Sequence, residues 1–332
     1  MQDPLAAVRA CADGALTTPG RGGAPAAPAL APAPARTLGD RLALAAADIK
    51  LSHSVFAMPF ALLGAFLARP TGAPWSQFAV QGGLIVGCMF FARSWAMLVN
   101  RIADSGFDAG NPRTARRAVA SGRLARRDAI AMAVACAASF CTLAALFGVL
   151  FGNWWPAGLC LPVLGWLALY SFAKRFTALC HVLLGTALAI SPMAACLAVQ
   201  PEVALSPVVL LLAGFVTLWV AGFDVLYALQ DTDFDRRTGL SSIPAKLGPA
   251  GAAWVSRGMH VGAAACLALA WRAEGRFGVL FGVAVGLAAV LLIVEHAVVI
   301  RRGLAGLPMA FFTVNGALSL LVGALGIADL LA

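Results

Sequence analysis

Long apolar segments, separated by short charged stretches, occupy most of the chain after residue 51. Crossing the hydrocarbon core of a bilayer takes about 20 predominantly apolar residues, with a range of roughly 17–25. Glycine and other small residues are frequent within these segments, as close helix packing in lipid favours. The sequence therefore predicts an all-α, polytopic membrane protein. Nine transmembrane helices are expected, at about 52–69, 78–100, 128–150, 154–172, 177–198, 206–223, 252–271, 277–300 and 308–330.

The composition excludes other classes of protein. Only 12% of the residues are charged, whereas a soluble domain carries about 25%. The net charge of +9 does not indicate a nucleic-acid partner, because the basic residues lie between apolar runs without an aromatic-basic binding motif. The eight cysteines form no Cys-x-x-Cys pair and lie mostly in apolar runs, which favours inert core thiols.

The first 38 residues differ from the rest. They hold six of the 18 prolines, and such a segment cannot bury enough apolar surface to offset its ordering entropy. They also lack the continuous apolar core of a signal peptide. We therefore expect a disordered tail over 1–38 and a membrane domain over 39–332.

The charge of the loops predicts the topology. The loops after the second, fourth, sixth and eighth segments carry fourteen arginines and lysines, whereas the opposite loops carry three. By the positive-inside rule the first set of loops is cytoplasmic, and the N-terminal tail falls on the same side.

Acidic residues gather in two short stretches, each of which follows an apolar segment into a loop of the basic face. Six of the 15 acidic residues lie there. They are Asp104 and Asp108 in the first stretch, and Asp224, Asp231, Asp233 and Asp235 in the second. Each stretch holds two aspartates spaced i, i+4, which places both on one face of a helix. The sequence thus predicts two similar helix groups that face one another.

Carboxylates in this arrangement need a cation, because they repel one another and are costly to cluster at membrane depth. Hard oxygen ligands suit Mg²⁺, which commonly shares its ligands with substrate phosphates. We therefore infer that the two aspartate pairs hold Mg²⁺ around one diphosphate. The alternative is that the aspartates form ion pairs with the abundant arginines.

The residues of three motifs resemble those of the UbiA superfamily of intramembrane prenyltransferases, over about residues 48–330. The first motif, Asn-x-x-x-Asp-x-x-x-Asp, is met by Asn100, Asp104 and Asp108, with Arg101 where the family often has Asp. The second is met by Asp224, Tyr227, Ala228, Asp231 and Asp235. Between them, Tyr170, Lys174 and Arg175 meet Tyr-x-x-x-Lys-Arg. The segment "IKLSHSVFAMPFALLGAF" resembles the 4-hydroxybenzoate polyprenyltransferase-like branch.

The resemblance implies nine helices around a central cavity, and a Mg²⁺-assisted transfer of a polyprenyl group from its diphosphate to an aromatic acceptor. Metal ions and cations stabilise charge on the departing diphosphate. The expected metal-binding residues are Asn100, Asp104, Asp108, Asp224, Asp231 and Asp235. The expected diphosphate-binding residues are Tyr170, Lys174, Arg175 and Arg113. Tyr227, Lys50 and His53 are candidates for the acceptor pocket.

The acceptor is expected to be 4-hydroxybenzoate on the route to ubiquinone, with 1,4-dihydroxy-6-naphthoate on the route to menaquinone as the alternative. The resemblance implies a bacterial inner membrane. A secondary transporter is the alternative of another class, since it too carries polar groups at membrane depth, but usually near the midplane. A CDP-alcohol phosphotransferase would pack its aspartates into one segment, which this sequence does not do.

Overall fold

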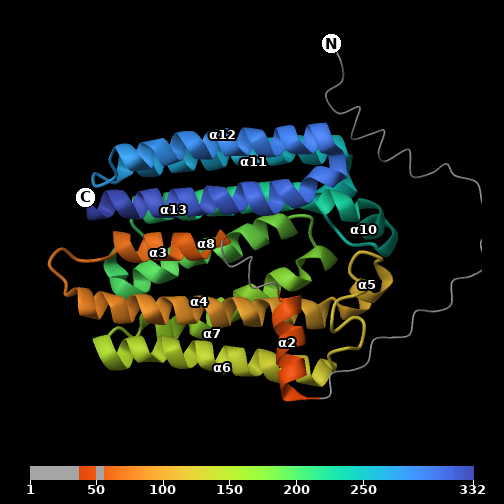
Figure 1. Ribbon diagram of the computed structural model, residues 1–332, viewed down its shortest axis with the longest axis horizontal. Coiled ribbons are helices and arrows are strands. Elements are labelled where there is room, and N and C mark those ends of the chain that lie inside the picture. The colour runs from red at the N-terminus through yellow and green to blue at the C-terminus, as the bar shows by residue number, and fades with distance from the viewer. Residues whose placement is uncertain (1–36, 50–55) are drawn as a thin grey trace, which may run out of the picture.

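The computed structural model describes residues 37–49 and 56–332, and all regular elements within these ranges are helices (Figure 1). The helices of the first half are α2 (Leu38–Asp48), α3 (Met58–Leu67), α4 (Trp75–Ala103), α5 (Ser105–Gly110), α6 (Arg126–Phe151) and α7 (Trp155–Phe172). Those of the second half are α8 (Cys180–Val199), α9 (Pro207–Tyr227), α10 (Thr232–Thr238), α11 (Ile243–Ala273), α12 (Val279–Arg302) and α13 (Asn315–Leu331). Residues 1–36 of the expected disordered tail lie outside the described residues, and its last two, Thr37 and Leu38, are the N-cap and first residue of α2.

The prediction of a multi-pass, all-α membrane protein is confirmed, but the count of nine spanning helices is not. Within the described ranges, seven helices are long and apolar enough to cross a bilayer. The first and seventh predicted spans coincide with α3 and α11, which are not among the seven. Helix α3 has only ten residues. Helix α11 is long enough even after its kink at Gly248, but Arg257 and His260 lie within its apolar run.

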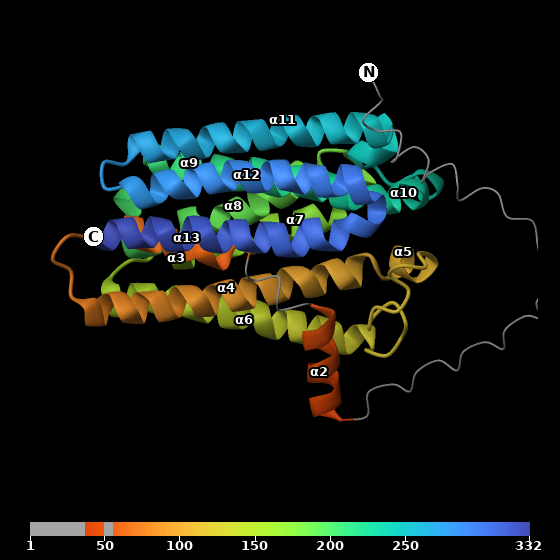
Figure 2. The ribbon, with the colours of Figure 1, turned by 45° about the horizontal axis from the view of Figure 1, so that its top comes forward.

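The long helices run roughly parallel or antiparallel to one another in a bundle (Figures 1 and 2). Helices α11, α12 and α13 lie along one side of it, and α4, α6 and α7 along the other. Helix α9 packs between α8 and α11 and is the most buried of the seven candidate spans. Its Trp219 and Phe215 are fully buried and stack at 5.7 Å. The apolar core therefore runs through α9, as expected of a helix that is hydrophobic all round.

The short helices gather at one end of the bundle. Helices α5 and α10 lie together at the end opposite the C-terminus (Figures 1 and 2). Helices α4, α7, α9 and α12 end on this side, and the connections from them carry both acidic stretches. Helix α2 lies across the bundle near the same end, with Ala45 and Ile49 packed in one apolar cluster with Leu98 and Ala129.

Candidate active site

The two acidic stretches lie at places where long helices break. Asp104 is the junction between α4 and α5, and Asp231 is the junction between the 3-10 turn Ala228–Asp231 and α10. In each pair the first aspartate is the N-cap of a short helix and the second lies inside that helix, so the helical spacing of the pair is kept within α5 and α10. The Asp108 N–H donates to the Asp104 carbonyl at 2.8 Å. The spacing did not show that the preceding long helices end at or before the first aspartate of each pair. The breaks let both stretches fold over the end of the bundle.

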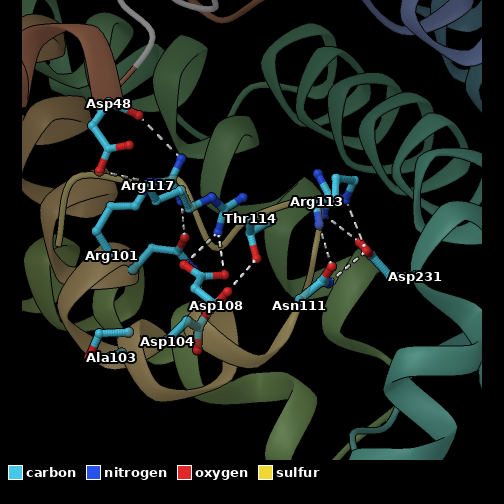
Figure 3. Close-up of polar contacts among 12 residues, drawn as sticks. Asp48, Arg101, Ala103, Asp104, Asp108, Asn111, Arg113, Thr114, Arg117 and Asp231 are labelled. Carbon is cyan, nitrogen blue, oxygen red and sulfur yellow. Dashed lines mark hydrogen bonds and ion pairs between the residues drawn. The ribbon is translucent and has the colours of Figure 1, made fainter. Parts of the chain in front are cut away.

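The first stretch is held by its own loop (Figure 3). Nη1 of Arg117 lies 2.8 Å from both carboxylate oxygens of Asp108. The Thr114 hydroxyl donates to the Asp108 carbonyl at 3.2 Å. Asp108 is buried, so its charge depends on this guanidinium.

Two residues of the same loop bind the second stretch (Figure 3). Arg113 donates from Nε to Oδ1 of Asp231 at 3.0 Å and from Nη2 to Oδ2 at 2.6 Å. The Asn111 amide donates to the same Oδ1 at 3.1 Å. Burial opposes the charge of Arg113, but the hydrogen bonds to Asp231 and the attraction of nearby acidic groups together raise the pKa of the guanidinium. The loop after the first acidic stretch therefore contacts the second stretch directly, in agreement with the prediction that the two stretches face one another.

The remaining two aspartates pair with the basic motif at the end of α7. Nζ of Lys174 lies 3.3 Å from Oδ2 of Asp235, and Nη2 of Arg175 lies 3.3 Å from Oδ1 of Asp104. Burial and the nearby Asp108 raise the pKa of Asp104, and Arg175 partly offsets this. All four aspartates of the predicted metal pairs are therefore matched with cations, in the ion-pair arrangement that the sequence left open as the alternative.

Asn100 and Arg101 orient Asp104 from below. The side-chain amide nitrogen of Asn100 donates to Oδ2 of Asp104 at 3.0 Å. The side-chain oxygen Oδ1 of Asn100 accepts from Nη1 of Arg101 at 2.8 Å. Arg101 is buried and also lies 3.6 Å from Asp48 of α2. The residue that departs from the family motif thus ties α2 to the site.

Asp224 has a partner that the sequence did not reveal. Nδ1 of His181, at the start of α8, lies 2.6 Å from its Oδ2. His181 is fully buried and shows no ligand spacing to another histidine in the sequence. Only the fold brings it to Asp224, across 43 positions.

The two tyrosines of the motifs lie in different surroundings. Tyr227 packs on Phe311 with ring centroids 4.3 Å apart, and Arg113 lies 5.7 Å above its ring. Tyr170 lines a cavity inside the bundle. Lys50 and His53 lie outside the described residues.

The cavity has a volume of about 780 Å³ and is lined by residues of α3, α4, α6, α7 and α8. Its walls are almost entirely apolar, with alanines of α4 and leucines of α7 and α8 among them. Along α7 it extends from Tyr170 to Trp155, a distance of about 22 Å at 1.5 Å per residue. Met97 lines it one turn before Asn100, so one end of the cavity lies beneath the aspartates.

Arg93 is the second residue of interest that sequence reasoning missed. It lines the cavity on the helix of the first acidic stretch, and its Nε is buried without a hydrogen-bond partner among the described residues. It interacts electrostatically with Tyr170. An arginine in the middle of an apolar segment was the available signal, since such residues tend to be functional.

The acidic residues that the structure describes do not form a metal cluster on their own. In the described ranges, no three His, Cys, Asp or Glu side chains are placed to hold a metal ion together. This arrangement still fits Mg²⁺, which is usually held by one or two carboxylates plus substrate phosphates rather than by an all-protein cage. The donor set of carboxylates from two facing stretches suits that mode.

Residues 57–327 match the model of the UbiA prenyltransferase family, which covers most of the chain. The chain belongs to this family. A UbiA homologue from Aeropyrum pernix K1 has the same fold, with a TM-score of 0.74 and 33% identity over 84% of this chain and 98% of the other. The family match removes the support for a transporter or a CDP-alcohol phosphotransferase.

More distant UbiA structures share the fold. The UbiA homologue from Archaeoglobus fulgidus bound to GPP and Mg²⁺ superposes with a TM-score of 0.66 at 17% identity, covering 87% of this chain and all of the other. At that identity the likeness concerns the fold alone.

Curated UbiA relatives match a shorter region. A 4-hydroxybenzoate octaprenyltransferase of Francisella tularensis subsp. novicida (strain U112) is 33% identical over 150 residues, which cover 45% of this chain and 50% of the relative. The enzyme of the same name from Acidovorax ebreus (strain TPSY) is 33% identical over 187 residues, 56% of this chain and 61% of the relative. The match to the Francisella relatives spans about half of their length.

Proposed function

We propose that this UbiA protein transfers a polyprenyl group from its diphosphate to a small aromatic acceptor, with 4-hydroxybenzoate as the acceptor and Mg²⁺ as the cofactor. The observation that carries the proposal is a neutral set of ion pairs at the end of an apolar cavity. Its members are Asp104, Asp108, Asp231 and Asp235 with Arg175, Arg117, Arg113 and Lys174.

The ion pairs contain cations that can bind a diphosphate and carboxylates that can bind its metal ion. Arginine suits bidentate contact with phosphate oxygens, and lysine acts as a point charge. When a diphosphate enters, Arg113, Lys174 and Arg175 can turn from their carboxylates to phosphate oxygens. The freed carboxylates of Asp231, Asp235 and Asp104 then face the metal. Because the diphosphate and Mg²⁺ enter together, the basic side chains gain phosphate partners while the carboxylates gain the metal ion. No buried charge is then left unpaired.

Asp104, Asp108, Asp231 and Asp235 would hold Mg²⁺, with Asn100 orienting Asp104 and Asp224 contributing from the side of α9. Bound Mg²⁺ supplies charge stabilisation to the departing diphosphate. Lys174, Arg175 and Arg113 stabilise the same developing charge from fixed positions on the protein. The allylic carbon–oxygen bond breaks with its electron pair passing to the diphosphate.

The apolar cavity receives the prenyl chain. Its walls of alanine, leucine and methionine exclude water, which would otherwise capture the electron-deficient allylic carbon. Tyr170 lies at the end of the cavity nearest the aspartates and interacts electrostatically with Asp104. The reacting carbon would therefore lie close to Tyr170, between the diphosphate and the tail.

Arg93 supplies a site for the acceptor. It is a cation in an apolar cavity with an unpaired Nε, which suits the carboxylate of 4-hydroxybenzoate. An electron-rich ring held there would attack the allylic carbon, form the new carbon–carbon bond, and then lose its ring proton to solvent or a nearby base. The names of the curated relatives favour 4-hydroxybenzoate. A dihydroxynaphthoate also carries a carboxylate and remains the second acceptor to test.

The four loops on the face that holds the aspartates carry 14 of the 24 arginines and lysines, so the site would face the cytoplasm by the positive-inside rule. The inner membrane of a bacterial cell is the proposed location. This location suits both substrates, since the prenyl chain is soluble in the bilayer and the acceptor is a small anion that can reach the site from the cytoplasm.

The test is a transfer assay with purified protein in liposomes. Octaprenyl diphosphate is supplied with Mg²⁺ or with EDTA, and 4-hydroxybenzoate and 1,4-dihydroxy-6-naphthoate are offered separately. The proposal predicts a prenylated product from 4-hydroxybenzoate only when Mg²⁺ is present. Product from the naphthoate alone would change the acceptor, and no product from either in folded protein would overturn the activity.

A further inference from the structure

His181 is a fully buried histidine that the proposed reaction does not use. It is the second residue of α8 and reaches across to α9, where its Nδ1 lies 2.6 Å from Oδ2 of Asp224. This is shorter than the two ion pairs of Lys174 and Arg175 at the same end of the bundle.

The second ring nitrogen fixes the tautomer of His181. The Ile243 N–H, at the start of α11, donates to Nε2 at 3.3 Å. Because Nε2 accepts this hydrogen bond, the proton lies on Nδ1, and Nδ1 donates to Asp224. The imidazole therefore joins α9 to the beginning of α11, and neither ring nitrogen is free to bind a metal.

Only one carboxylate oxygen of Asp224, Oδ2, is hydrogen-bonded within the described part of the chain. Among the described residues, its Oδ1 has no hydrogen-bond partner, and the side chain is 22% exposed. Lys174, which pairs with Asp235, also interacts electrostatically with Asp224. Asp224 therefore lies at the same end of the bundle as the ion pairs.

We propose that His181 is a positioning residue that holds the Asp224 carboxylate in place for the Mg²⁺ of the diphosphate, directly or through a metal-bound water. This inference rests on the proposed function. Carboxylates that bind metals are commonly oriented by a hydrogen bond to the oxygen that does not face the ion, and losing that partner typically lowers metal affinity about 10–100-fold.

Three substitutions separate positioning from simple packing. H181Q keeps a donor and an acceptor on one planar group, which can serve Asp224 and Ile243 together. H181L removes both hydrogen bonds. D224N keeps an oxygen that can accept from His181 but removes the negative charge. H260L is the matched control, because His260 is another buried histidine, on α11, bonded to His296 rather than to an aspartate.

The measurement is binding of Mn²⁺, as a paramagnetic probe for Mg²⁺, by electron paramagnetic resonance. The full-length protein in detergent is saturated with farnesyl thiodiphosphate, which does not react. Relative to wild type, we expect the Mn²⁺ dissociation constant to rise on the order of tenfold in H181L and D224N. It should stay near the wild-type value in H181Q and H260L. The double variant H181L/D224N should match D224N alone, since His181 acts through Asp224.

Unchanged Mn²⁺ binding in D224N, or equal losses in H181L and H260L, would overturn the positioning role. If H181L does not fold, D224N and H181Q decide: weak binding in D224N with normal binding in H181Q supports the role, and weak binding in both or in neither contradicts it. A wild-type protein that binds no Mn²⁺ in the presence of the diphosphate would instead overturn the metal site of the proposed function.

Discussion

Arg113 and Asp231 form a two-point ion pair across 118 positions of the chain, with N–O distances of 2.6 and 3.0 Å. The pair joins the loop after the first acidic stretch to the break in the second. It also places a guanidinium that fits phosphate beside a carboxylate that fits Mg²⁺. Of the residues expected to bind diphosphate, Arg113 makes the shortest contact with the second motif, since Lys174 lies 3.3 Å from Asp235.

Replacing Arg113 by lysine should lower activity although the charge is kept. Lysine cannot reproduce two parallel hydrogen bonds to one carboxylate or phosphate. We expect kcat/KM for the prenyl diphosphate to fall about tenfold, which corresponds to about 1.4 kcal/mol. Steady-state kinetics measure this, with R116K as the control, because Arg116 lies in the same loop and is exposed. Equal kinetics in R113K and wild type would remove Arg113 from the site.

Asp231→Asn should abolish most turnover while the protein still inserts and purifies. The amide keeps the size of the side chain but loses the charge that pairs with Arg113 or binds Mg²⁺. We expect a loss on the order of 100-fold, typical of a damaged metal site. D233N is the matched control, because Asp233 lies two residues away and is exposed. Turnover near normal in D231N would contradict the metal assignment.

Lys174→Met should weaken binding of the prenyl diphosphate more than binding of the acceptor. The variant removes a point charge beside Asp235 and keeps the apolar stem. Isothermal binding of a prenyl thiodiphosphate and of 4-hydroxybenzoate gives both dissociation constants. K246M is the control, since Lys246 is exposed at the start of α11. A larger effect on the acceptor would reassign Lys174.

Arg93→Leu should raise KM for the aromatic acceptor and leave the prenyl diphosphate dissociation constant unchanged. Arg93 lines the cavity below the ion pairs, and its loss removes the proposed partner of the acceptor carboxylate. A charge-assisted hydrogen bond contributes about 1.5–3 kcal/mol, so KM should rise at least tenfold. A matching rise in the prenyl diphosphate constant would place Arg93 in the diphosphate site instead.

Ala144→Phe should restrict the length of the prenyl donor. Ala144 is buried and lines the cavity on α6, so a phenyl ring there fills space that a long chain needs. We expect kcat/KM for octaprenyl diphosphate to fall more than that for geranyl diphosphate. V149F is the control, because Val149 is exposed on the same helix. Equal losses for both donors would show that the tail leaves the bundle elsewhere.

Local patterns accounted for the membrane fold because long apolar segments have few alternatives in a bilayer. Most predicted spans overlap a described helix, and the site end was predicted from loop charge and the spacing of Asp104, Asp108, Asp231 and Asp235. The helix breaks at Asp104 and Asp231 were missed, because an i, i+4 spacing reads as continuous helix. After Asp104 the Ser105–Gly106 dipeptide was an available turn signal, whereas no Gly or Pro lies close to Asp231.

His181 and Arg93 could not be assigned from sequence for a different reason. Each acts through a partner or a cavity that only tertiary structure supplies: His181 meets Asp224 across 43 positions, and Arg93 lines a space shared by five helices. A lone histidine or an arginine in an apolar run indicates only that the position is unusual. The role of the side chain can be inferred only from the residues or the cavity that it contacts.

The proposed site is tested most directly by a structure of the protein with Mg²⁺ and a non-reactive prenyl thiodiphosphate. We expect Mg²⁺ about 2.0–2.1 Å from carboxylate oxygens of both acidic stretches. We also expect Arg113 to turn from Asp231 to a phosphate oxygen, with the prenyl chain in the cavity beside Tyr170. Intact ion pairs between Arg113 and Asp231 and between Lys174 and Asp235, with the ligand bound elsewhere, would contradict the proposed site.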